Sequence, residues 1–235
     1  MRKVLGILLV GLMVLAVFGA GCITGETTTT GEGTGSSMGH GPPEGKGYGG
    51  RGPGSSTQEV TNVSSYPAQN LSQDEIEAIL YMREEEKLAR DVYLTLYNLT
   101  GLQIFDNIAR SEQTHMDMVL GLIEKYNLTD PVAGMGVGEF NSTEMRDLYE
   151  KLVAQGSKSE VDALKVGALI EEIDIKDLDE WLERTDNEDV KVVFESLREG
   201  SENHLRAFTR ILSNRYGVTY EPQVLSKDEY ESIVG

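Results

Sequence analysis

The stretch from Ile108 to Val119 reads IARSEQTHMDMV and joins an apolar helical face to two side chains that can bind a metal ion. Glu112 and His115 stand three residues apart, so a helix projects both from one face. That face continues in the apolar residues Ile108, Ala109, Met116, Val119, Leu122 and Ile123. A buried carboxylate and a buried imidazole each need a partner, because burying an isolated charge is very costly. We therefore expect a helix whose polar pair faces a counter-charge or a metal.

Histidines are scarce in this chain, and this makes their positions informative. His115 and His204 are the only histidines after residue 60. His204 lies within an apolar stripe formed by Val193, Phe194, Leu197, Phe208 and Ile211. Glu-x-x-His is the helical unit from which carboxylate-bridged di-metal sites in four-helix bundles are built. Two inward-facing imidazoles on two helices are therefore candidates for one shared site.

Four long stretches have the apolar periodicity of amphipathic helices. They span residues 73–99, 105–126, 158–183 and 186–216. Ser72 and Glu75 have the spacing of a capping box at the start of the first helix, and Gly101 ends that helix. Gly217 closes the last helix in the same way. No alternating pattern is strong enough to predict a β-sheet.

The connection between the second and third helices is long, from Thr129 to Gly156. Its first half is rich in glycine, and its second half predicts a short accessory helix capped by Ser142 or Thr143. Two helical hairpins joined by one long crossover form the ferritin-like topology. We therefore predict an all-α, ferritin-like four-helix bundle. Residues 219–234 should add an extended piece and a short helical turn packed on this bundle.

The first 22 residues predict a secretory signal, with a basic start, an apolar stretch and small residues before Cys22. We favour a lipoprotein signal in which Cys22 is lipidated. An uncleaved transmembrane anchor is the alternative, because the apolar stretch is close to membrane-spanning length. Residues 23–65 are rich in Gly, Thr and Ser and predict a disordered tether. The folded domain is then residues 66–235, placed outside the cytoplasm and anchored to the cell membrane.

The formal net charge of −18 belongs to the predicted domain, because basic and acidic residues balance in residues 1–60. Such an acidic surface repels phosphate backbones and argues against nucleic acid as a partner. Cys22 is the only cysteine in the chain. An intramolecular disulfide and thiol catalysis in the folded domain are therefore excluded.

The first and third helices also carry acids near their apolar faces. Glu171 and Asp174 are three residues apart in the third helix and can both point inward. Glu172 is turned away from them by about 100° and is expected to be exposed to solvent. In the first helix periodicity slightly favours Glu85 as the inward residue and does not exclude Glu86.

Each of these side chains alone has an ordinary explanation. A single histidine on an apolar helical face is usually a core residue that hydrogen-bonds one neighbour, and a single buried glutamate usually pairs with arginine or lysine. All four predicted helices nevertheless place an acid or an imidazole on the inner face. One shared metal site explains this coincidence better than four independent pairings.

Several stretches resemble an uncharacterised family of prokaryotic proteins, the domain-of-unknown-function family 2202, which is assigned to the ferritin/rubrerythrin-like superfamily. The matching stretches are EEEKLARDVY (84–93), IARSEQTHM (108–116), ALKVGALIEEIDIKDL (163–178), GSENHLRAF (200–208) and YEPQVLS (220–226). Together they cover roughly residues 70–235. The resemblance implies a ferritin-like fold and leaves the activity open.

The superfamily pattern implies roles for individual residues. Its first helix carries a glutamate, an alanine three residues later and a tyrosine seven residues later, which here are Glu86, Ala89 and Tyr93. The resemblance therefore favours Glu86 over Glu85 as a metal ligand. It assigns the other ligand positions to Glu112, His115, Glu171, Asp174 and His204.

One position departs from the superfamily pattern. The fourth helix should carry a second Glu-x-x-His, but Ser201 occupies the glutamate position before His204. Losing one carboxylate lowers the affinity for a metal pair, and Asp174 is the candidate to compensate. The alternatives are a mononuclear site, or a relic in which the acids and imidazoles only hydrogen-bond one another.

The resemblance implies a di-iron or di-manganese centre that reacts with oxygen or peroxide, or that oxidises ferrous iron. Tyr93 is then the candidate catalytic residue, as a hydrogen-bond donor to a ligand carboxylate or as an electron donor. A non-catalytic metal-binding lipoprotein and a purely structural helical module are the alternatives. The partners that we expect are metal ions, a small oxidant, the membrane and a second copy of the chain.

Overall fold

The computed structural model describes residues 63–235, and this part of the chain is helical and contains no strand. Its elements are η1 (Val63–Ser65), α2 (Gln73–Thr100), α3 (Gln103–Lys125), α4 (Thr143–Gly156), α5 (Glu160–Leu182), α6 (Glu188–Tyr216) and α7 (Lys227–Val234). The predicted signal, residues 1–22, and the predicted tether, residues 23–65, lie outside the described residues apart from the three residues of η1. None of the helices in the described part is long and apolar enough to cross a membrane.

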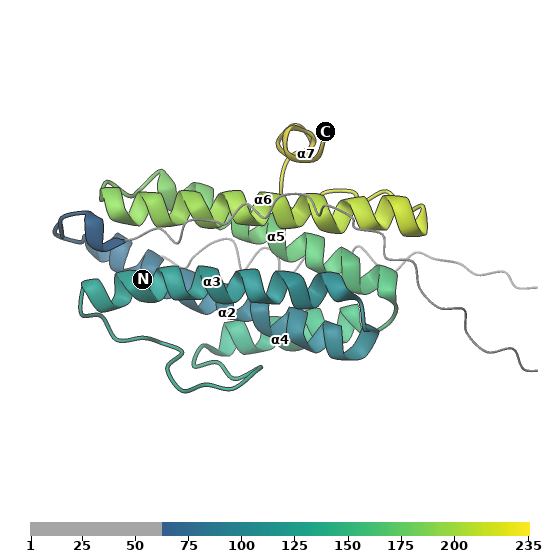
Figure 1. The fold of residues 1–235 in the computed structure, drawn as a ribbon, viewed down its shortest axis with the longest axis horizontal. Helices are drawn as coiled ribbons and strands as arrows, with labels where there is room; N and C mark the ends of the chain where they lie inside the picture. The colour runs from purple at the N-terminus through teal and green to yellow at the C-terminus, as the bar shows by residue number, and fades with distance from the viewer. Residues whose placement is uncertain (1–62) are drawn as a thin grey trace, which may run out of the picture.

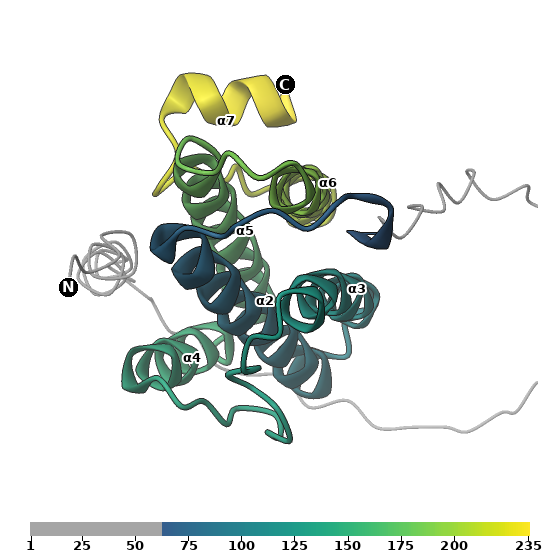
Figure 2. The ribbon, with the colours of Figure 1, turned by 90° about the vertical axis from the view of Figure 1, so that its left-hand side faces the viewer.

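The four long helices form two antiparallel hairpins, α2 with α3 and α5 with α6, which pack against each other (Figure 1). A crossover that carries α4 joins the hairpins, so α2 and α6 run in one direction and α3 and α5 in the other (Figure 1). Figure 2 shows α4 beside α2 and α5, and α7 lying across the outside of α6. The predicted four-helix bundle with a long crossover and an accessory helix is confirmed. This connectivity is the one described for ferritin-like bundles.

The residues that the sequence predicted as helix caps are found at the helix ends. Ser72 caps α2 and forms the predicted capping box with Glu75. Gly101 (φ 69°) and Gly217 (φ 64°) end α2 and α6 in the left-handed conformation that glycine adopts without strain. Ser142 caps α4 by accepting a hydrogen bond from the backbone of the first helical turn.

The core consists of two apolar clusters with a layer of polar side chains between them along the bundle. Residues 83–87 of α2, 110–117 of α3 and 198–204 of α6 separate the two clusters on those helices. On α5, Glu171 and Asp174 are buried among the last apolar members of one cluster. All four long helices therefore place buried polar side chains at one level of the bundle.

Glu172 is not exposed to solvent as its position on α5 predicted; it is 0% exposed. Its carboxylate accepts hydrogen bonds from the hydroxyl of Tyr220 and from the backbone N–H groups of Gln223, Val224 and Leu225. The prediction was wrong because the chain after α6 folds back over this face of α5 and covers it. Glu172 therefore anchors the segment between α6 and α7.

Replacing Glu172 by alanine should destabilise the domain. Glu172→Ala leaves three backbone N–H groups without their acceptor, and we expect the free energy of unfolding to fall by about 2–4 kcal/mol. Chemical denaturation followed by circular dichroism measures the change. Glu195→Ala, at an exposed position of α6, is the matched control and should have little effect. Equal stabilities of the two variants would contradict the anchoring role.

Candidate metal centre

Five of the side chains singled out from the sequence meet in the polar layer. They are Glu86 from α2, Glu112 and His115 from α3, Glu171 from α5 and His204 from α6. None of the five is more than 8% exposed. The helical hairpins thus bring residues far apart in the sequence into one enclosed site.

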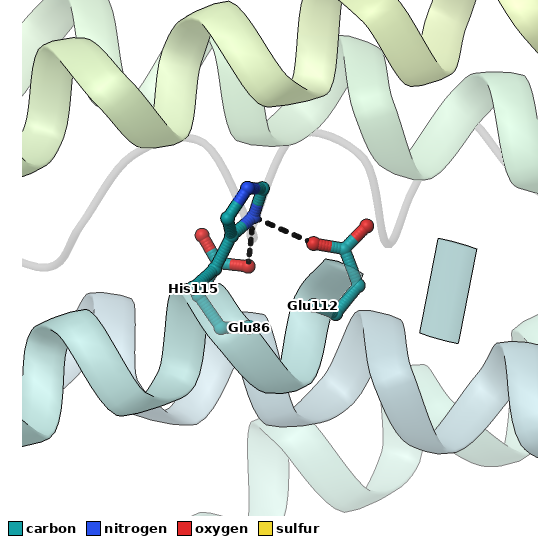
Figure 3. A group of neighbouring side chains, drawn as sticks. All are labelled: Glu86, Glu112 and His115. Carbon is teal, nitrogen blue, oxygen red and sulfur yellow. Dashed lines mark hydrogen bonds and ion pairs between the residues drawn. The ribbon is translucent and has the colours of Figure 1, made fainter. Parts of the chain in front are cut away.

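Figure 3 shows the first group of candidate ligands, Glu86, Glu112 and His115. The Nδ1 atom of His115 lies 2.7 Å from Oε2 of Glu112 and 3.3 Å from Oε2 of Glu86. One ligand atom from each residue lies within 4.8 Å of the other two. A single ion with metal–ligand bonds of about 2 Å can span this group.

The second group consists of Glu112, Glu171 and His204. One ligand atom from each of these residues also lies within 4.8 Å of the other two. The Nδ1 atom of His204 lies 2.9 Å from Oε1 of Glu112 and 3.4 Å from Oε2 of Glu171. Its other ring nitrogen, Nε2, lies 3.0 Å from the hydroxyl oxygen of Ser111. A contact of this kind on the far nitrogen fixes the orientation of a ligand imidazole.

Glu112 belongs to both groups and joins them. Its Oε2 faces His115 and its Oε1 faces His204. The two imidazole rings are 5.6 Å apart between their centroids and are inclined by 28°. Glu112 is therefore placed as a carboxylate bridge between two adjacent metal positions, as in the carboxylate-bridged sites of four-helix bundles.

Several buried atoms of the polar layer lack a hydrogen-bond partner within the described residues. They are Glu85 Oε2, Glu86 Oε1, His115 Nε2 and Asp174 Oδ1. The basic side chains nearest in sequence pair elsewhere, Arg83 with Asp130 and Lys87 with Asp91. Since an unpaired buried polar atom is costly, this donor set fits a group that carries positive charge into the layer.

The imidazoles and carboxylates strongly perturb one another. Burial alone would raise the pKa of Glu112, but His204 and His115 outweigh it and hold this pKa well below its usual range. Burial lowers the pKa of His204, but Glu112 and Glu171 raise it to about 10. Burial raises the pKa of Glu86 to about 7, against the opposing effect of His115. Protonated imidazoles thus balance carboxylate charge in this layer, and a metal ion that binds here would displace those protons.

Glu85 and Glu86 are both buried, at 4% and 2% exposure, but it is Glu86 that contacts His115. Glu85 belongs to neither group of candidate ligands. Burial raises the pKa of Glu85 well above its usual range, and the charges of Asp177 and Asp174 raise it further. Periodicity could not decide which of the two glutamates is the candidate ligand. The inward face of a bundle helix is at least about 100° wide, so neighbouring residues can both be buried on it.

Asp174 is buried but lies outside both groups of candidate ligands. Its Oδ2 accepts a hydrogen bond from Ser201, which stands at the position where the resemblance predicted a glutamate. Burial raises the pKa of Asp174 well above its usual range, and the charge of Glu86 adds to this effect. The Asp174 carboxylate of α5 therefore reaches the position on α6 at which that glutamate was predicted.

Tyr93 is fully buried and donates a hydrogen bond to Oε1 of Glu171. Its hydroxyl also lies 3.3 Å from the carbonyl oxygen of Gly167. The ring packs against Phe105 and Phe208, with centroid distances of 6.0 and 5.5 Å. Tyr93 thus holds one candidate ligand from the apolar side of the site.

The family model for the uncharacterized protein domain DUF2202 matches residues 64–235. The chain belongs to this family. The uncharacterized protein MJ0754 of Methanocaldococcus jannaschii is 60% identical over 172 residues, which are 73% of this chain and 92% of that protein. A crystal structure of hypothetical protein MJ0754 from Methanococcus jannaschii matches with a TM-score of 0.70 and 60% identity, over 72% of this chain and 95% of that one.

Two further residues of this DUF2202 domain position the imidazoles and were not singled out from the sequence. Ser111 contacts His204, as described above. Gly200 lies on α6 directly against His115, and a Cβ atom at this position would overlap the Nε2 and Cε1 atoms of the ring. A glycine in a helix interior costs about 1 kcal/mol relative to alanine. A glycine on the buried face of a predicted helix was the signal in the sequence that could have indicated the close contact between α6 and His115.

Replacing Gly200 by alanine should push the His115 ring away from Glu86 and Glu112. We expect changed imidazole resonances of His115 and a loss of about 1–3 kcal/mol in the free energy of unfolding from overpacking. Heteronuclear NMR measures the shift, and the chain has only three histidines to assign. Gly121→Ala on α3, where an added Cβ meets only the Val63 side chain, is the control. Unchanged His115 resonances in the Gly200 variant would show that the contact does not position the ring.

Proposed function

We propose that this DUF2202 domain binds a pair of iron or manganese ions in its polar layer and uses them in redox chemistry with oxygen or peroxide. The observation that carries the proposal is the position of Glu112, whose two carboxylate oxygens each face a different imidazole. The ligands of the pair would be Glu86, Glu112, His115, Glu171 and His204, with Asp174 as an additional carboxylate.

The donor set supports iron or manganese. Imidazole nitrogens and carboxylate oxygens suit these metals, and the described residues contain no cysteine that would favour softer ions. Two divalent ions would match the four carboxylates among the proposed ligands, namely Glu86, Glu112, Glu171 and Asp174.

Bound in this position, such a pair would supply the electrons that reduce oxygen or peroxide. The residues of the chain set the conditions for this chemistry. The two apolar clusters on either side of the layer exclude bulk water. Tyr93 fixes the carboxylate of Glu171 and offers a hydrogen atom next to the site. The described residues hold no cysteine for a sulfur-bound electron carrier, so the reductant would be a separate molecule.

A non-catalytic metal-binding role is the second candidate, and Ser201 is the observation that favours it. A serine in place of a bridging glutamate leaves the site with fewer anionic ligands, which weakens binding and favours exchange of ions. A metal-capturing protein displayed outside the cell would use this property. Export and membrane anchoring through residues 1–22 stay predictions from the sequence, because these residues lie outside the described part of the chain.

The metal content should depend most strongly on Glu112, because both groups of ligands share this residue. After loading with Fe(II) or Mn(II) under anaerobic conditions and dialysis against metal-free buffer, the protein should keep about two ions per chain, one for each group of ligands. Glu112→Gln should lose both ions, whereas Glu86→Gln and Glu171→Gln should each lose about one. Elemental analysis measures the content.

The matched control is Glu202→Gln, because Glu202 lies two residues from His204 but pairs with Arg198 and Arg206 on the outer side of α6. This variant should keep the full metal content. Wild-type content in Glu112→Gln would refute the bridging role of Glu112, and absence of metal from the wild-type protein would refute the proposed function.

Removing the Tyr93 hydroxyl should slow the reaction without emptying the site. Tyr93→Phe loses the hydrogen bond to Glu171 but keeps every candidate ligand, so we expect normal metal content and Fe(II) oxidation slowed by about 10-fold or more. Stopped-flow absorbance of ferric iron after mixing with oxygen or peroxide measures the rate. Tyr97→Phe, one helical turn further along α2 and partly exposed, is the control. Wild-type protein that binds metal but shows no oxidation would favour the non-catalytic role.

A further inference from the structure

We propose that Asn127 is an N-glycosylation site, at which the side-chain amide carries an oligosaccharide. The proposal goes beyond the metal chemistry and rests on the predicted export of the chain, because Asn-x-Ser/Thr triplets are glycosylated in secreted proteins. Asn127 opens such a triplet with Leu128 and Thr129. The modified residue lies in the turn that leads from α3 into the crossover.

Asn-x-Ser/Thr triplets are more frequent in this chain than chance predicts. Five of its nine asparagines open one, namely Asn62, Asn70, Asn98, Asn127 and Asn141. All nine asparagines lie in residues 61–235, where serine and threonine together are 21 of 175 residues, so about one triplet is expected by chance. The excess favours a chemical use of the triplet over coincidence.

The structure separates the triplets by whether their reacting groups are free. Asn98 lies within α2, and the hydroxyl of Thr100 donates a hydrogen bond of 2.7 Å to a backbone carbonyl of the same helix. The triplet of Asn70 ends at Ser72, whose hydroxyl caps α2 and bonds Glu75. In both triplets the folded structure already uses the hydroxyl that the transfer reaction needs.

The triplets of Asn62 and Asn141 are weaker candidates for other reasons. Nδ2 of Asn141, the atom that would be modified, donates a hydrogen bond of 2.8 Å to the carbonyl oxygen of Pro131. Asn62 lies outside the described residues. Among the four triplets that the structure describes, only the one at Asn127 therefore remains with both groups free.

The side chains of Asn127 and Thr129 are exposed and form no hydrogen bond within residues 63–235. Leu128 between them packs against the core, so the two polar side chains stand on the outside. Asn127 has a φ of 50°, which asparagine tolerates, and follows the last residue of α3. The crossover leaves the end of the bundle at this point (Figure 1). A transferase can thus reach the triplet without unwinding a helix.

The transfer reaction uses both free groups. Nδ2 of Asn127 attacks the anomeric carbon of an oligosaccharide that is linked to a lipid through phosphate. The new nitrogen–carbon bond forms as the carbon–oxygen bond to the phosphate breaks; the lipid phosphate leaves with the bonding electrons, and a base of the membrane-bound transferase takes one amide proton. The Thr129 hydroxyl is the group by which the transferase recognises the triplet through a hydrogen bond.

The test is peptide mass spectrometry of the full chain, with its own residues 1–22, purified from its source organism. We expect the peptide with Asn127 to carry an oligosaccharide in most molecules. The peptide with Asn107, which is exposed on α3 but opens no triplet, should be unmodified. Thr129→Ala should lose the oligosaccharide at Asn127, and Thr129→Ser should keep it. Thr219→Ala is the matched control, because Thr219 is exposed and belongs to no triplet.

Unmodified Asn127 in the wild-type protein would refute the proposal, as would an oligosaccharide found only at the other triplets. An oligosaccharide that persists at Asn127 in Thr129→Ala would also contradict it, since the triplet would then not be the recognised feature. Asn127 belongs to neither group of metal ligands, so Thr129→Ala should keep the metal content of the wild-type protein. Failure of the proposed metal site is therefore a separate result, measured on the same samples.

Discussion

The burial of acids and imidazoles in the middle of an apolar bundle is the constraint on which the rest of this structure depends. Two apolar clusters lie on either side of the layer, and each long helix contributes buried polar side chains to it. Charged groups in such surroundings are stable only when opposite charges balance. The two imidazoles balance part of the acid charge, and Glu112 holds both of them with one carboxylate. The geometry of the layer is thus set by charge balance as much as by packing.

The layer is asymmetric, and the asymmetry has one origin. The α3 helix provides a complete Glu-x-x-His unit, whereas α6 provides a histidine preceded by Ser201. Asp174 of α5 accepts a hydrogen bond from Ser201, at the position where the resemblance predicted a glutamate. As a result, α5 supplies two carboxylates to the layer and α6 supplies none. The additional carboxylate of α5 thus compensates for the lack of an acid on α6, its partner in the hairpin.

The sequence was sufficient to predict where the helices lie and which polar side chains meet in the layer. Periodicity, the capping box at Ser72 and the terminal glycines located the helices, and the i, i+3 spacing placed Glu112 and His115 on one face. It was not sufficient where a residue's partner lies elsewhere in the chain. Glu172 is buried only because the segment after α6 covers it, and no pattern within α5 reports that contact. The contact of Gly200 with His115 likewise depends on how closely α3 and α6 approach.

If the proposed metal pair binds here, the shared carboxylate also means that its two positions are not independent. If Glu112 turns to improve its contact with His115, its other oxygen moves relative to His204, because the two oxygens belong to one rigid planar group. An ion bound at one position therefore fixes the orientation of Glu112 for the other, which favours binding of the second ion, while the charge of the first ion opposes it. A second bridging carboxylate would reduce that repulsion, and Asp174, which accepts a hydrogen bond from Ser201, is a buried carboxylate outside both groups that could be recruited. In the proposed site, the balance between orientation and repulsion would therefore depend on whether Asp174 stays hydrogen-bonded to Ser201 or turns to the ions.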